Sequence, residues 1–207
     1  AVQVEGAEFV SINPQQDSLK FNAKSAIYSL REVKLEAKEV PYIVVADAEI
    51  VPNKGNVVIF EHAAMQTLDS SQIIANRQFR YHRIYDASTQ VFGRWKYKSN
   101  GKYDYVDENG LSQVIELTNI GVDTTRQTFA EGVIAEEDDF SLSPNYRYKG
   151  KVDLFANRKN LTYKGHSKLA LDCKNLPNVW FSFNGEIDPN EILIKVDEET
   201  HDHDQKT

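Results

Sequence analysis

The feature that most constrains the fold is the shortness of the apolar segments. Each clear segment spans only four or five residues, is rich in β-branched or aromatic side chains, and is bounded by polar residues, Gly, Asn or Asp. This pattern predicts many short β-strands. No run approaches the ~20 apolar residues of a transmembrane helix, so we expect no transmembrane segment. The clearest segments are Tyr42 to Val45, Val57 to Phe60, Val114 to Leu117, Val152 to Phe155, Val179 to Phe183 and Ile192 to Val196.

Length and composition suit one substantial core. The chain has 207 residues, of which 41% are apolar, and no change in composition marks a domain boundary. We therefore expect a single β-rich domain over residues 1–196, followed by a disordered acidic tail over 197–207. The first residue is Ala1 and no secretion signal follows it, so we also expect either a processed protein or a fragment of a larger chain.

The charge balance disfavours one class of partner. The chain carries 24 basic and 31 acidic side chains, a formal net charge of −7. A nucleic-acid binder needs a basic face to neutralise phosphates, so no nucleic-acid partner is expected.

Residues 23–39 allow two interpretations. Apolar residues recur there at helical spacing, which is compatible with a helix ending before Pro41. However, Leu19 to Tyr28 aligns with Val33 to Tyr42 at an offset of 14 residues, and both copies begin with an apolar–polar alternation. Because alternation at period two is typical of strands, we favour strands and keep the helix as the alternative.

A weaker repeat suggests how the strands are arranged. Ile73 to Arg77 and Leu154 to Arg158 share an Ala-Asn-Arg core after two apolar residues. Strands that recur with a small residue and a turn fit a stack in which each layer packs on its neighbours. The predicted fold is therefore all-β, a solenoid-like or jellyroll stack of short strands.

An antiparallel meander is predicted within this stack at about 91–119. Asn100-Gly101 lies between two alternating runs, and Asn-Gly is the preferred dipeptide of a type I′ hairpin turn. A second turn is expected at Asp107 to Gly110, before the strand Leu111 to Leu117.

The meander also carries the candidate binding residues. Aromatic side chains alternate there with Arg and Lys, and such a strip can stack on sugar rings or pack against a protein. Cross-strand pairing inside the meander is the structural alternative. The candidates are Trp95, Tyr97, Tyr103 and Tyr105.

Metal and nucleophile chemistry have weak support. His62, His82 and His166 lie in no metal-binding motif, and we interpret them as strand or surface residues. The tail segment His201 to Asp204 could hold a metal only loosely. Cys173 follows Asp172, which raises rather than lowers a thiol pKa, so a structural cysteine is favoured.

The carboxylates and the glycine motifs give no support for a metal, cofactor or catalytic site either. Glu136 to Asp139 is an acidic run without a calcium-loop pattern, and we interpret it as a solvated loop. Phosphate-binding glycine motifs and the GxSxG motif are absent from the sequence. We therefore expect no cofactor, no metal and no catalytic residue.

Several segments resemble parts of large, repeat-rich, uncharacterised β proteins of the Gram-negative cell envelope. They include VPYIVVADAEIVP, IIANRQFRYHRIYDA, GKYDYVDENG, FSLSPNYRYKGKVDLFANRKNLTYKG and VWFSFNGEIDP. More loosely, strands that end in Ala-Asn are similar to the OstA-type β-jellyroll of lipopolysaccharide transport. The resemblance implies a periplasmic, outer-membrane or surface location. It assigns no ligand-contacting residue.

These observations predict a non-catalytic structural or interaction module of the cell envelope. A glycan- or lipid-binding module is the first alternative, and a carbohydrate-active β-helix enzyme is the second. The opening strand, Val2 to Val4, alternates at once and offers no polar cap. An uncovered stack presents unpaired backbone groups, so we expect another protein or more of the same polypeptide to cover at least one end.

Overall fold

The computed structural model describes residues 2–170 and 179–189, and this part contains 15 strands. Four 3₁₀ turns complete the regular structure: η1 (Pro14–Gln16), η2 (Asn53–Gly55), η3 (Glu61–Ala63) and η4 (Glu136–Asp138). The all-β prediction is confirmed. The strands are β1 (Val2–Val10), β2 (Lys20–Ser29), β3 (Lys34–Lys38), β4 (Ile43–Val45), β5 (Ala48–Val51), β6 (Val57–Ile59), β7 (Leu68–Ala75), β8 (His82–Gly93), β9 (Lys96–Val106), β10 (Ser112–Val122), β11 (Thr128–Ile134), β12 (Ser141–Ser143), β13 (Tyr146–Phe155), β14 (Leu161–Leu169) and β15 (Phe181–Ile187).

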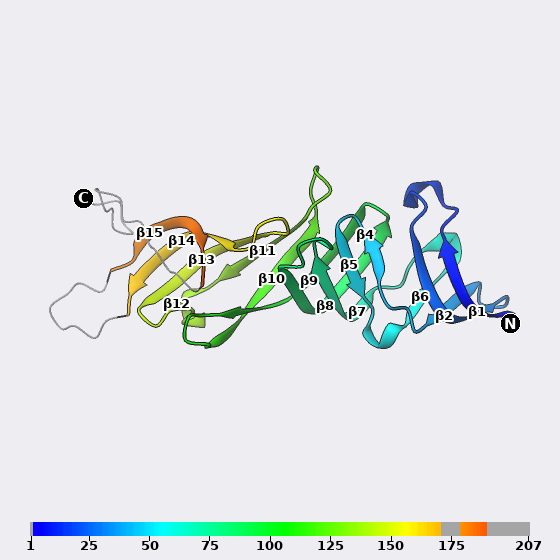
Figure 1. Ribbon diagram of the computed structural model, residues 1–207, viewed down its shortest axis with the longest axis horizontal. Coiled ribbons are helices and arrows are strands. Elements are labelled where there is room, and N and C mark those ends of the chain that lie inside the picture. The colour runs from blue at the N-terminus through cyan, green and yellow to red at the C-terminus, as the bar shows by residue number, and fades with distance from the viewer. Residues whose placement is uncertain (1, 171–178, 190–207) are drawn as a thin grey trace.

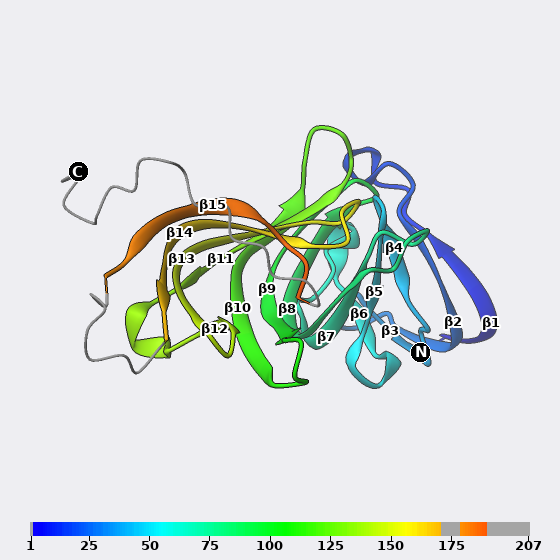
Figure 2. The ribbon, with the colours of Figure 1, turned by 60° about the vertical axis from the view of Figure 1, so that its left-hand side comes forward.

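All these strands belong to one open antiparallel sheet. Its main path runs β15-β14-β13-β11-β10-β9-β8-β7-β5-β4-β2-β3-β6, and β1 and β12 pair beside it with β2 and β13. Neighbours in the sheet are mostly neighbours in sequence, so the molecule is elongated, with β1 and β15 near opposite ends (Figure 1). Turned by 60°, the long central strands are seen to curve strongly (Figure 2).

β13 and β14 approach each other closely at a pair of glycines. Gly150 pairs with Gly165 in the ladder, and Gly150 has a φ of 140°. A Cβ atom built on Gly165 would lie 2.2 Å from the carbonyl oxygen of Lys149. No larger residue fits there without moving the backbone, so the two strands depend on glycine at this contact.

The predicted meander is present, but one of its two turns is elsewhere. β8, β9 and β10 pair antiparallel in sequence order, and Asp107 to Gly110 forms the second turn with Gly110 at a φ of 81°. The first turn is at Arg94 and Trp95, because Gly93 pairs with Lys96. The prediction of a turn at Asn100-Gly101 is wrong.

The reason is that Gly101 lies inside the long strand β9, opposite Leu117 of β10. A Cβ atom there would be 2.7 Å from Cγ2 of Ile84. A glycine within a strand marks a close approach as readily as a turn, and here close packing against β8 explains it.

Residues 23–39 form strands, and the helical alternative is wrong. The two aligned segments fall on β2 and β3, which pair antiparallel with Ala26 opposite Ala37. Both alanines are buried, which explains why small residues occupy these positions. The weaker repeat falls at the ends of β7 and β13, where Ala75 and Ala156 are fully buried.

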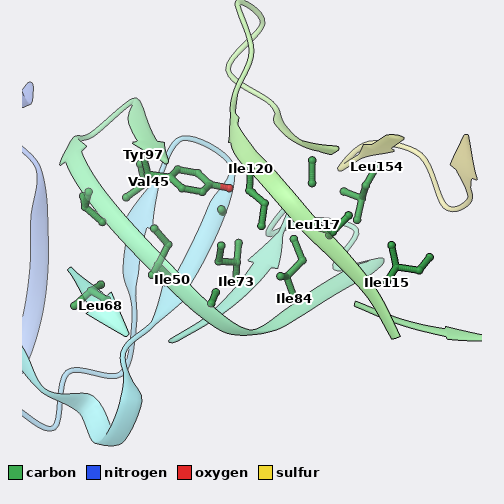
Figure 3. Close-up of a cluster of buried hydrophobic side chains, with 14 of the residues drawn as sticks. Val45, Ile50, Leu68, Ile73, Ile84, Tyr97, Ile115, Leu117, Ile120 and Leu154 are labelled. Atoms are coloured by element: carbon green, nitrogen blue, oxygen red, sulfur yellow. The ribbon is translucent and has the colours of Figure 1, made fainter. Parts of the chain in front are cut away.

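The core runs along the length of the sheet. Aliphatic side chains from β5, β7, β8 and β10 gather there in one cluster with Tyr97 of β9, as Figure 3 shows for Ile50, Ile73, Ile84 and Ile120. Buried hydroxyl groups are paired across three strands, from Ser71 through Thr89 to Ser99, with oxygen separations of 3.0 and 2.8 Å. This pairing removes the cost of burying them.

Candidate functional site: an open strand edge beside an apolar hollow

The first strand is an edge strand. In the described part of the chain, β1 pairs only with β2, through a register that runs from Val2 opposite Tyr28 to Val10 opposite Lys20. Its other side therefore presents a row of unpaired N–H and C=O groups. Natural proteins usually shorten, charge or cover such an edge, because it can template a further strand.

The side chains of β1 make this edge partly apolar. Val2, Val4 and Val10 are 53%, 42% and 49% exposed. Glu8 forms an exposed ion pair with Lys20 at 2.8 Å, so the strand carries charge at that position. A nine-residue edge strand is long for an exposed edge, and its three exposed valines lie among exposed Glu5 and Glu8.

An apolar hollow of about 180 Å³ lies beside the C-terminal half of β1. Phe9 of β1 stacks on Phe21 of β2 with ring centroids 5.4 Å apart, and both rings line the hollow. Across from them, Leu35 pairs with Ile59 where β3 meets β6. The remaining lining includes Ile12, Leu19 and Met65, and Ile12 is 97% exposed.

Two side-chain hydrogen bonds hold the walls of the hollow together. The Gln16 amide donates to the carbonyl oxygen of Ala63 at 2.8 Å, and the Asn13 amide donates to that of His62 at 3.0 Å. These bonds join the η1 turn to the η3 turn, 47 and 49 residues along the chain. The hollow is therefore a formed feature of the fold.

The four predicted binding aromatics do not share one exposed face. Tyr97 and Tyr105 are 1% and 2% exposed, and their hydroxyl groups bond to Thr128 and to the carbonyl oxygen of Leu142. Their packing matches the structural alternative of pairing inside the meander. Tyr103 is half-buried against His82, and Trp95 is half-buried at the β8–β9 turn. A binding role for Trp95 and Tyr103 stays a prediction.

The histidines lie apart from one another. His82 is fully buried, whereas the side chain of His62 is 86% exposed in the η3 turn. His166 is half-buried on β14. Within residues 2–170 and 179–189, no three His, Cys, Asp or Glu side chains are grouped as metal ligands would be. Cys173 and the segment His201 to Asp204 lie outside the described residues.

The acidic residues are engaged in local contacts. Glu136 of the acidic run pairs with Lys149 at 2.8 Å, which lowers the pKa of that carboxyl group. Glu49 is bound by Arg77 and Arg80. All the strand pairs are antiparallel, whereas the rungs of a β-helix pair in parallel, so the geometry does not favour the β-helix enzyme.

Sequence reasoning missed a buried carboxyl site at Asp47. Its Oδ1 accepts hydrogen bonds from the backbone N–H and the hydroxyl group of Thr128, at 2.8 and 2.6 Å. Burial raises the pKa of this carboxyl group. The two residues are 81 positions apart, and no local motif signals their contact.

The comparisons with protein families, curated proteins and solved structures found no match to the chain. No helix in the described part of the chain is long and apolar enough to cross a membrane. The candidate site consequently stands on the geometry of β1 and the adjacent hollow.

Proposed function

We propose that this chain is a non-catalytic interaction module that binds a β-strand of another polypeptide along the free edge of β1. The open backbone edge of β1 carries the proposal. A partner strand would complete its hydrogen bonds, and the hollow lined by Phe9 and Phe21 would accept apolar side chains of that partner.

The chemistry of the edge defines the partner. Val2, Val4 and Val10 favour a strand with apolar side chains, because burying them removes apolar surface from water. Backbone pairing supplies affinity, and the hollow supplies selectivity for side-chain size. Location in the bacterial cell envelope is part of this proposal and is supported by the resemblance of the segments quoted above.

Self-association of the isolated chain tests the proposal. Without its partner, an open apolar edge pairs with other copies, so light scattering at increasing concentration should show a rising molar mass. Val4→Lys places a charge on the edge and should keep the chain monomeric. Val114→Lys is the matched control, because Val114 is also exposed (53%) but pairs with Asp104 of β9, in the middle of the strand order and away from β1.

Two results would overturn the proposal. One is a monomer up to high micromolar concentration. The other is association that Val4→Lys and Val114→Lys reduce equally, since this would reflect general surface hydrophobicity.

A lipid is the second candidate ligand, because the lining of the hollow is almost entirely apolar. A fluorescent fatty acid distinguishes the two. Saturable binding that Val4→Lys leaves intact, and that a polar substitution of the lining residue Met65 abolishes, would favour the lipid.

A further inference from the structure

A second groove lies on the side of β2 and β4 and differs in character from the hollow. It encloses about 320 Å³ and is lined by both basic and aromatic side chains. We call it the arginine groove and define it by Lys20, Tyr42, Arg77 and Arg94. Arg77 follows β7 and Arg94 follows β8, so turns from different parts of the sheet build it.

The groove is locally basic in a protein of net charge −7. Lys20 is neutralised by Glu8 at 2.8 Å. Glu49 forms ion pairs with Arg77 at 3.4 Å and with Arg80 at 2.6 Å. These three side chains together carry one net positive charge. Arg94 has no carboxylate within 4 Å among the described residues. Two arginine charges are therefore left for an anionic ligand.

The backbone holds these arginines in place. The N–H of Arg94 donates to the carbonyl oxygen of Gln16 at 3.0 Å, and its own carbonyl oxygen accepts from Ala46 at 2.8 Å. The N–H of Arg77 donates to the carbonyl oxygen of Asp47 at 2.8 Å. The backbone of both residues is thus anchored to the β4–β5 turn, which fixes the points from which the two side chains extend.

Trp95 contacts one of the two arginines of the groove. The Arg94 guanidinium lies 4.7 Å from the Trp95 ring centroid, and the Arg126 guanidinium lies 4.1 Å from it. Such contacts favour a defined orientation of the guanidinium plane. Trp95 therefore contributes by positioning Arg94.

Tyr42 supplies the apolar contact of the groove. It is 39% exposed, beside Pro41, and both residues line the same space as the two arginines. An aromatic ring that is half in water offers a face for stacking against the C–H groups of a sugar. Arginine binds carboxylates through two parallel hydrogen bonds.

From this arrangement we propose that the arginine groove binds a carboxylated sugar of an anionic glycan. The ring of the sugar rests on Tyr42, and its carboxylate is held by Arg77 and Arg94. The proposal does not depend on strand binding at β1, because the two sites are tested by different variants and ligands.

Titration with a tetramer of galacturonic acid, followed by calorimetry on the full chain, tests this site. The chain should bind the acidic oligosaccharide and not the neutral galactose tetramer. Arg94→Gln and Arg77→Gln should each weaken binding about tenfold or more, because a hydrogen bond to a charged group is lost. Tyr42→Ser should weaken it several-fold. Circular dichroism and the melting temperature confirm that each variant is folded.

Arg83→Gln is the matched control for charge. Arg83 is exposed on β8, donates to Gln72 at 2.7 Å and does not line the groove, so the variant should bind like the parent. Equal losses in Arg83→Gln and Arg94→Gln would show nonspecific attraction and overturn the proposal. Full competition by equimolar inorganic phosphate, or binding unaffected by Tyr42→Ser, would also overturn the sugar assignment.

Discussion

The Nε2 atom of His82 lies 2.7 Å from the carbonyl oxygen of Arg158, across 76 residues of sequence. The bond joins β8 to the turn after β13. Its Nδ1 atom lies 3.3 Å from the hydroxyl group of Tyr103. This arrangement suits a neutral imidazole that donates from Nε2 and accepts at Nδ1, and burial lowers the pKa of the ring.

Acid should destabilise the protein through His82. The unfolded chain takes up a proton as the pH falls below about 6.5, whereas the native ring stays neutral to a lower pH. Stability is thus retained above pH 6.5 and lost as the pH falls toward the native pKa. Urea denaturation between pH 7.5 and 5 should show the decline. His82→Gln should flatten it, while His62→Gln, at an exposed position, should leave the slope unchanged.

Asp47 should act in the opposite direction. Burial raises its native pKa above the value of 3.8 of a free side chain, so the folded state keeps a proton that the unfolded state releases. The resulting contribution to the unfolding free energy is present below pH 3.8 and is lost as the pH rises through the native pKa. Asp47→Asn should flatten this part of the stability profile.

Two further variants check this account of Asp47. Asp47→Ala should cost about 1–3 kcal/mol at neutral pH, because it leaves the N–H and hydroxyl groups of Thr128 without their acceptor. Glu137→Gln, on the exposed η4 turn, should behave like the parent. A profile that is the same in Asp47→Asn and the parent would contradict the prediction.

Two buried tyrosines should respond differently to loss of the hydroxyl group. The Tyr105 hydroxyl donates to the carbonyl oxygen of Leu142 at 2.7 Å, whereas that of Tyr163 is buried and has no hydrogen-bond partner among the residues that the structure describes. Tyr105→Phe should cost about 1 kcal/mol in unfolding free energy, because it leaves a buried acceptor unpaired. Tyr163→Phe should be neutral or stabilising. Equal costs in the two variants would show that Tyr163 has an unrecognised partner.

Much of the fold could be predicted because its signals are local. The short apolar runs mark the strands, and Asp107-Glu-Asn-Gly110 marks its turn, where the Asp107 carboxylate accepts from the N–H groups of Asn109 and Leu111 at 2.9 Å. The turn predicted at Gly101 is absent, although the neighbouring residues in the sequence suit a turn. The role of Gly101 is set by Ile84, which packs against it from another strand.

The candidate sites depend on contacts that sequence patterns do not record. The burial of Tyr97 and Tyr105 follows from which face of β9 meets the core, and an alternating run does not define that face. The arginine groove combines Arg77, Arg94 and Tyr42, which meet only because the turns after β7 and β8 pack against the β4–β5 turn. Their proximity is a property of the strand order.

Gly165 should be among the least replaceable positions in the sheet. A Cβ atom there would lie 2.2 Å from the carbonyl oxygen of Lys149 and 2.7 Å from the Cα of Gly150, so Gly165→Ala forces β13 and β14 apart. Overpacking against backbone should cost about 1–3 kcal/mol or more in the unfolding free energy. The measurement is the midpoint of urea denaturation. Gly185→Ala is the control, because Gly185 lies on the next strand, opposite Tyr163. Among the described residues, its Cβ atom would meet only the Phe183 ring, at 3.6 Å. That variant should be neutral or slightly stabilising, since alanine restricts the unfolded chain. Equal midpoints for the two variants would show that the β13–β14 ladder can widen at no cost in stability.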